Sequence, residues 1–330
     1  MRRRIASAAL ILVLLLTAAT PALAVECGKA KTAQDRALCA NPPALAADAA
    51  MTKAYQARLA QLSAPAKNQL VLSQRAWLKS RTYECPDAAE KKLAQCLAKN
   101  SRERQFFLEG RPETGPGSGG MLVPISVETV GRKGYYAIDV TALKYAQPPS
   151  AGEKLFNAET GKLMKQIPAG ENDAFGRNMI YSFILHMRMV YASPQLISAN
   201  IESYQFAGGA HGNSAANNIN IDVAKAKILQ FADVFPDTAT PELDAECLQQ
   251  ILKEKAKRLP NETIAGDTLK HLRASIDAGL IKLDSWSFST AGAIVGYDAY
   301  DLGAYVEGTY SCTFSAAFLR PLVKPSFALP

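Results

Sequence analysis

The order of apolar and polar residues changes about a third of the way along the chain. Through residues 27–108, apolar side chains recur at steps of three and four, which is typical of amphipathic helices. Capping residues at Thr32, Asn41 and Ser63 begin three helices, and Cys85-Pro86 ends the third before a fourth follows. Because the connections are short, we expect a small antiparallel helical bundle.

Glycine and proline are frequent in residues 110–121, which is the composition of a linker. Beyond it, short apolar runs separated by turn residues predict strands, and stretches of helical period lie between them. Strands are expected at Leu122–Val127, Tyr135–Val140, Ile180–Val190, Leu196–Phe206, Asn218–Val223, Ile228–Phe231, Trp286–Ser289, Ala293–Tyr297 and Thr309–Phe314, and helices at Glu153–Lys165, Glu242–Leu259 and Thr263–Leu280. The order predicts a helical domain over residues 25–109 and an α+β domain over 122–330, with one mostly antiparallel sheet.

The first 24 residues have the pattern of a secretory signal peptide. A basic start at Arg2–Arg4 precedes an apolar run, and Ala22-Leu23-Ala24 forms a small-residue cleavage site. The alternative is an uncleaved anchor, but the apolar run is short for spanning a bilayer. A lipoprotein would need a small residue before Cys27, where the chain has Glu26. We therefore expect a soluble periplasmic or secreted protein without a membrane span.

Export makes disulfides the expected state of the cysteines. The chain has six, at Cys27, Cys39, Cys85, Cys96, Cys247 and Cys312. The last two are distant from the others and are expected to pair with each other. The first four allow three connectivities, among which we favour the local pairs Cys27–Cys39 and Cys85–Cys96.

Composition and charge exclude some classes of protein. The chain is 48% apolar and 20% charged, which is typical of a folded protein and not of a disordered one. Residues 25–110 carry a net charge of +6, and residues 111–330 a net charge of −2. The basic helical part is either an ordinary solvated face or a surface for an anionic partner. Basic residues are not interleaved with aromatic ones, so no nucleic-acid partner is expected.

A set of residues in the helical part carries a family resemblance. Gln74-x-x-Trp77-Leu78-x-x-Arg81-x-x-x-Cys85, together with the flanking cysteines, resembles the LprI N-terminal family over nearly the whole of residues 27–108. The namesake of that family is a lysozyme inhibitor, so the resemblance implies lysozyme binding. On its own pattern, Trp77 is expected in the core. Gln74 and Arg81 then belong to an internal polar network or, alternatively, flank a groove.

The second part of the chain resembles another family. Residues 204–213, 220–222 and 297–308 look like the C-terminal extracytoplasmic domain shared by the anti-sigma factor RsiV and the deacetylase PdaC. In RsiV that region senses lysozyme, and in PdaC it accompanies the catalytic domain. Both resemblances therefore point to lysozyme or peptidoglycan as the partner.

The candidate binding residues lie in a glycine-rich loop and in a segment rich in tyrosine and acidic residues. They are Gly208, Gly209, His211, Asn213, Tyr297, Tyr300, Asp301 and Tyr305. We expect the loop of residues 207–213 and the segment of residues 297–307 to share one edge of the domain and to form its partner surface. The alternatives are a tight strand connection for the loop and ordinary packing for the tyrosines.

Catalysis is not expected from this sequence. A catalytic His211 would need a nucleophile or a partner acid, for which Asp222 is a candidate, but no nucleophile elbow is present. The three histidines lack the spacing of a zinc site, so neither a metal nor another cofactor is expected. We expect a non-catalytic envelope protein that binds or inhibits lysozyme. The alternatives are a peptidoglycan recognition module without inhibitor activity and a hydrolase that uses His211.

Overall fold

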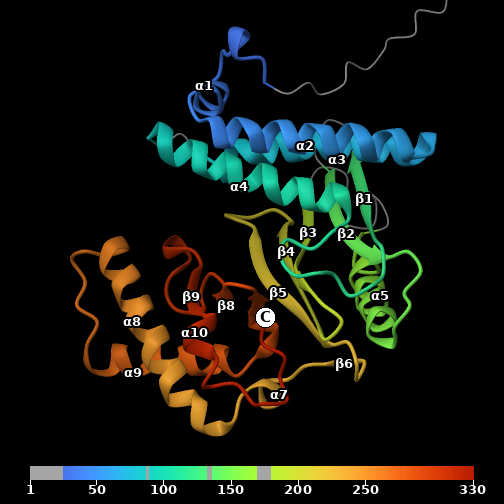
Figure 1. The fold of residues 1–330 in the computed structure, drawn as a ribbon. Coiled ribbons are helices and arrows are strands. Elements are labelled where there is room, and N and C mark those ends of the chain that lie inside the picture. Colours follow the sequence, from blue (N-terminus) through green and yellow to red (C-terminus); the bar gives the residue numbers. More distant parts are fainter. Residues whose placement is uncertain (1–24, 87–88, 132–135, 169–179) are drawn as a thin grey trace, which may run out of the picture.

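The computed structural model describes residues 25–86, 89–131, 136–168 and 180–330, so the expected signal peptide lies outside the described residues. A layer of helices lies at the top of the molecule in Figure 1, a large sheet lies below it, and a mixed lobe built from the C-terminal residues lies beside the sheet. Within the described ranges, no helix combines the length and the apolar character needed to cross a membrane.

The helical layer begins and ends where the local signals place it. A short turn, η1 (Cys27–Lys29), precedes α1 (Ala33–Cys39), α2 (Pro42–Gln61), α3 (Ala64–Glu84) and α4 (Glu90–Glu109). Thr32 and Asp35 form a capping box at the start of α1, and the Asn41 side chain accepts from the Ala44 amide at the start of α2. The prediction of a helical region over residues 27–108 is therefore confirmed.

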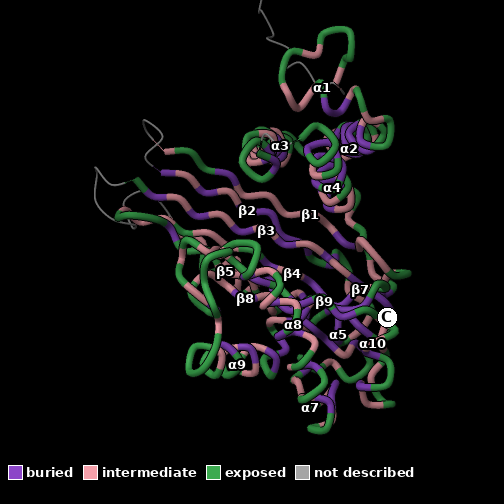
Figure 2. The backbone as a smooth tube through the Cα atoms, turned by 90° about the vertical axis from the view of Figure 1, so that its left-hand side faces the viewer, coloured by how far each residue is buried: buried purple, intermediate pink, exposed green. Residues whose placement is uncertain are grey.

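The large sheet has the strand order β1-β2-β3-β4-β5-β6. Its strands are β1 (Leu122–Val130), β2 (Tyr136–Tyr145), β3 (Tyr181–Ala192), β4 (Leu196–Phe206), β5 (Asn213–Asp222) and β6 (Lys227–Ile228). Neighbouring strands are antiparallel except β2 and β3, which run parallel because α5 (Ala151–Met164) lies in the crossover between them. Burial alternates along β3, as the banded strands of Figure 2 show, so the sheet has two distinct faces.

The remaining strands form a second sheet instead of joining the first. Strands β7 (Trp286–Ser289), β8 (Gly292–Tyr297) and β9 (Tyr310–Ser315) pair in that order, with α7 (Phe231–Val234), α8 (Thr240–Arg258), α9 (Gly266–Leu280) and α10 (Ala316–Leu319) around them. The expectation of one sheet is thus wrong, although the α+β class is confirmed. The reason is that β7 packs across the face of the large sheet, where the Phe288 amide donates to Ser198 Oγ and the Asn220 side chain donates to the Trp286 carbonyl.

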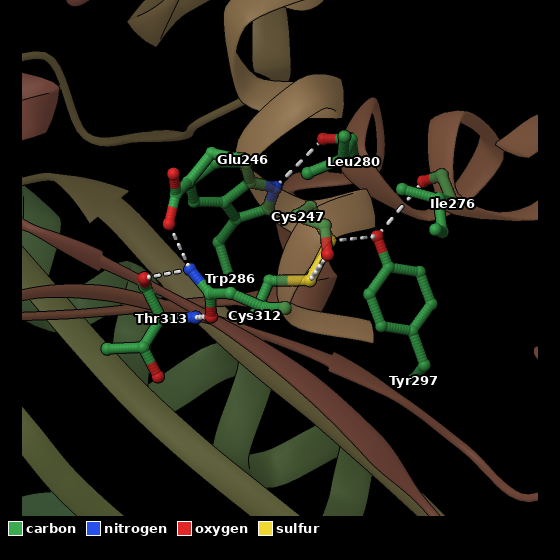
Figure 3. The surroundings of a disulfide bond; sticks show 9 residues. Glu246, Cys247, Ile276, Leu280, Trp286, Tyr297, Cys312 and Thr313 are labelled. Carbon is green, nitrogen blue, oxygen red and sulfur yellow. Dashed lines mark hydrogen bonds between the residues drawn. A yellow bond between two sulfur atoms is a disulfide. The ribbon is translucent and has the colours of Figure 1, made fainter. Parts of the chain in front are cut away.

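All three expected disulfides are present. Cys27–Cys39 and Cys85–Cys96 close loops within the helical region. Cys247 of α8 and Cys312 of β9 join a helix to the small sheet, as Figure 3 shows. Both of these cysteines are fully buried, in the apolar core that includes Trp286.

The helical layer and the large sheet share one apolar core. Met51, Tyr55, Leu70, Trp77 and Phe107 belong to the same buried cluster as residues of β1–β5. The glycine- and proline-rich connection after α4 is also bound to the sheet, because the amides of Glu113, Thr114 and Gly117 donate to carbonyls at the end of β3. Strand β2 pairs with β3 only as far as His186, so the last residues of β3, up to Ala192, are left to pair with the connection.

Candidate functional site

One face of the large sheet carries a patch of polar side chains. The register places Thr141 beside His186, His186 beside Glu202, and Arg188 beside Asn200. Because side chains alternate along a strand, these residues all lie on the same face. His186 and Arg188 stand out in the sequence as polar residues within the mostly apolar β3, but their position on one polar face depends on the neighbouring strands.

Two adjoining clefts lie over this polar face. The first, of about 330 Å³, is bounded by α3, α4 and strands β2–β4, and Trp77, Asn100, Glu103 and Arg104 are among its lining residues. The second, of about 580 Å³, lies between β3–β5 and the small sheet, and Asn200, Tyr204, Asn218 and Asp298 are among its lining residues. Glu84, His186, Arg188 and Glu202 line both clefts. We call the two clefts together the groove.

Carboxylates gather around Arg188 inside the groove. Its guanidinium forms ion pairs with Glu103 and, at 3.4 Å, with Glu113. Burial alone would lower the pKa of Arg188, but Glu103, Glu113, Glu202 and Glu84 together raise it above its ordinary value. The pKa of Glu113 is raised by burial and by the like charges of Glu103 and Glu202, against the effect of Arg188. The region around Arg188 therefore holds more negative than positive charge.

Two neighbouring carboxylates, Glu128 of β1 and Asp139 of β2, lie beneath the helical layer. Burial and the neighbouring Asp139 raise the pKa of Glu128 to about 8, so Glu128 is protonated at neutral pH. Asp139 also contacts His186, and the distance from Asp139 Oδ2 to His186 Nε2 is 3.2 Å. The Glu128 amide donates to the side chain of Gln69 on α3. These contacts connect the polar face of the sheet to the helical layer.

The residues of the Gln-Trp-Arg motif form the expected polar network. Arg81 donates to Asp48 at 2.8 Å, and Arg104 donates through Nε to the Gln74 side chain at 3.0 Å. Trp77 is buried, and both guanidinium groups lie over its ring at 5.0 and 5.8 Å from the centroid. Burial lowers the pKa of Arg104 to about 10. The network is internal, although Trp77 and Arg104 also reach the wall of the first cleft.

The glycine-rich loop and the tyrosine-rich segment are in direct contact. The His211 ring stacks on Tyr305 with centroids 3.8 Å apart, and its Nε2 lies 3.3 Å from the Tyr300 hydroxyl. The Tyr305 hydroxyl and His211 Nδ1 both lie 3.0 Å from the Gly212 carbonyl oxygen. Positive φ angles at Gly208 and Gly209 turn the chain into this position. We call His211, Gly212, Tyr300 and Tyr305 the histidine cluster.

The other candidate residues divide between the surface and the interior. Asp301 and Asn213 are exposed, and the Asp301 carboxylate accepts from the Asp298 amide at 2.7 Å. Tyr300 is 61% exposed, with a positive φ of 79°. Tyr297 was expected to be partly exposed, and this is wrong. It is 2% exposed, because the alternation of β8 points it inward, where its hydroxyl donates to the Ile276 carbonyl beside the disulfide (Figure 3).

The histidine cluster lies at one end of the groove. Gly212 packs against the Tyr204 ring, which leaves no room there for a Cβ atom, and Tyr204 lines the second cleft. Asp298 lines the same cleft and accepts from the Ala216 amide. The suggested pairing of His211 with Asp222 is wrong, because Asp222 ends β5 at the opposite end of the strand and binds Lys225. Among the described residues, no group of three metal-ligating side chains could hold an ion.

Comparison with known protein families gives a match to the helical part of the chain. Residues 27–108 match the family described as lysozyme inhibitor LprI, so about a quarter of the chain is an LprI domain. A comparison with curated proteins finds no match. The chain is similar to the crystal structure of a DUF3298 family protein from Pseudomonas aeruginosa, with 18% identity and a TM-score of 0.42, covering 62% of this chain and 95% of that one. It is similar to a DUF3298 family member from Bacteroides fragilis, with 14% identity and a TM-score of 0.41, covering 63% and 95%.

Proposed function

We propose that the protein is an exported, non-catalytic binding protein, periplasmic or secreted, that binds lysozyme and inhibits it. The observation that carries this proposal is the match of residues 27–108 to the lysozyme inhibitor family. The three disulfides are typical of an oxidising compartment and support export.

The partner surface in this proposal is the groove together with the histidine cluster and the exposed Asp301 beside Tyr300. Lysozymes of the c type are basic, so a partner surface for them should present negative charge. The helical part has a net charge of +6, but its Glu84 and Glu103 lie in the groove together with Glu202 and Asp298. A basic partner would therefore meet carboxylates from both parts of the chain at this surface.

The surroundings of His211 support binding over catalysis. Its ring nitrogens lie next to the Gly212 carbonyl and the Tyr300 hydroxyl, and neither group is the carboxylate that would orient a catalytic base. Stacking on Tyr305 holds the ring in place at the surface. A preformed aromatic cluster of this kind loses little entropy when a partner binds.

The test is a titration of the protein, starting at Val25, with a c-type lysozyme. Binding is measured by calorimetry and inhibition by the clearing of a cell-wall suspension. We expect saturable binding and a matching loss of lysis. His211→Ala and Asp301→Ala should each weaken binding about thirtyfold, which corresponds to about 2 kcal/mol. The control is Asp267→Ala, which removes an exposed aspartate from α9 and should bind as the parent does. Absence of binding by the parent would refute the proposal.

A second candidate function is recognition of peptidoglycan without inhibition. The observation that favours it is the polar lining of the second cleft, to which the hydrogen-bonded amides of Asn200 and Asn218 and the ring of Tyr204 contribute. Amide and tyrosine side chains suit the hydroxyl and acetamido groups of a glycan. Pulldowns with muropeptides and with lysozyme, done side by side, separate the two functions.

A further inference from the structure

The first cleft collects carboxylates from separate elements of the chain. Glu84 ends α3, Glu103 lies on α4 and Glu202 lies on β4, and all three line the cleft. Glu113, which follows α4, does not line the cleft but pairs with Arg188. All four contribute to the electrostatic environment of Arg188. The Arg188 guanidinium therefore faces four carboxylates. Of the two other cations that line the cleft, Lys99 has a side chain that is 71% exposed and pairs with Glu103 at the rim, and Arg104 is buried and donates to Gln74.

Arg188 forms ion pairs with two of these four carboxylates, Glu103 and Glu113. Glu84 accepts a hydrogen bond from the side-chain amide of Asn100. In the part of the chain that the structure describes, the carboxylate of Glu202 takes part in no hydrogen bond or ion pair, and the residue is exposed in the cleft. Glu202 is thus available to an incoming cation.

A buried amide at the cleft wall provides an independent observation. Asn100 is only 9% exposed and lines the first cleft. Its nitrogen donates to Glu84, while its Oδ1 has no hydrogen-bond partner among the described residues. A buried acceptor without a partner is unfavourable, so it favours a ligand that brings hydrogen-bond donors.

We propose that this cleft binds the side chain of an arginine or lysine from a basic partner protein, with Glu202 as the main counter-charge. The inference rests on the proposed function, since it specifies which group of lysozyme the protein holds. A guanidinium has five N–H donors and no acceptor, which matches a cleft lined by carboxylates and by Asn100, whose buried amide oxygen has no partner among the described residues. The cleft volume of about 330 Å³ is large enough for one such side chain.

The test uses two ligands and a matched pair of variants. The ligands are a c-type lysozyme and a capped tetra-arginine peptide, and a tetra-citrulline peptide of the same shape controls for charge. Glu202→Gln removes the counter-charge without breaking an ion pair, so folding should be unchanged. Glu242→Gln removes an exposed carboxylate at the start of α8, outside the groove.

We expect the parent to bind tetra-arginine and not tetra-citrulline at low salt, as measured by calorimetry. Glu202→Gln should weaken the binding of both tetra-arginine and lysozyme about tenfold, and Glu242→Gln should leave both unchanged. The inference is overturned if tetra-arginine does not bind, or if the two variants behave alike. If tetra-arginine binds as expected and lysozyme does not bind the parent, the proposed function fails while the cation site stands.

Discussion

The ion pair between Asp48 and Arg81 offers a direct test of how the helical domain is stabilised. The side chains are 5% and 7% exposed, and the pair joins α2 to the last turn of α3. Asp48→Ala removes the carboxylate and leaves the Arg81 guanidinium buried without its counter-charge. We expect this variant to be strongly destabilised.

The size of the effect follows from the surroundings of Arg81. Removing one partner of a buried ion pair typically costs about 3–5 kcal/mol. Two features keep the expected loss toward the lower end of that range. Arg81 lies in the last turn of α3, where the helix dipole favours a cation by about 0.3–1 kcal/mol. It also stays over the Trp77 ring, at 5.0 Å from the centroid. We therefore expect a loss of about 3–4 kcal/mol.

Urea unfolding, followed by the fluorescence of the two tryptophans, measures this loss. The double variant Asp48→Ala/Arg81→Leu removes both charges of this pair and leaves neither without its partner, so it should be more stable than Asp48→Ala alone. Glu159→Ala breaks a pair in which Lys162 is 67% exposed, and it should cost less than about 1 kcal/mol. A loss below about 1 kcal/mol for Asp48→Ala, or a double variant less stable than the single one, would refute the reasoning.

Two further predictions concern pH and the disulfides. The pKa of Glu128 is about 8 in the folded protein and near its ordinary value when unfolded, so its contribution to stability is present at low pH and is lost as pH rises from about 4.5 to about 8. Melting temperatures between pH 5 and pH 9 should therefore fall less for Glu128→Gln than for the parent, and equal slopes would contradict this. Replacing both Cys247 and Cys312 by alanine should cost about 4 kcal/mol, against about 3 kcal/mol for Cys85 and Cys96, because the loops close over 65 and 11 residues. Urea unfolding of the two double variants measures both losses of stability. A larger loss for the shorter loop would contradict the chain-entropy argument.

Local signals in the sequence were enough to predict most of the elements. The capping box of Thr32 and Asp35 fixes the start of α1, and the alternation in Leu196–Phe206 gives β4 with its observed bounds. The short spacing of Cys27 and Cys39 likewise makes their pairing the simplest one. Each of these features depends on residues that are close in sequence, so it can be recognised without knowing the fold.

The groove could not be predicted because its residues are distant in sequence. Glu84 and Glu202 are 118 residues apart, and only the pairing of β3 with β4 and the position of α3 bring them together. The loop of residues 207–213 and the segment of residues 297–307 were expected to share one edge, in part from a family resemblance, and the structure places His211 beside Tyr300. Tyr297 was misplaced because it stands in the same acidic, tyrosine-rich run as Tyr300, and only the direction of β8 separates them.

The shared core of the helical layer and the large sheet has a consequence for the order in which the chain folds. Synthesis supplies α2–α4 before any strand of the large sheet, because β1 begins at Leu122 and β3 begins at Tyr181. Until the strands emerge, Leu70 and Phe107 have no sheet to cover them, although both are buried in the finished protein. A nascent chain stopped near residue 120 would therefore expose an apolar surface, which is the kind of surface that aggregates or binds chaperones.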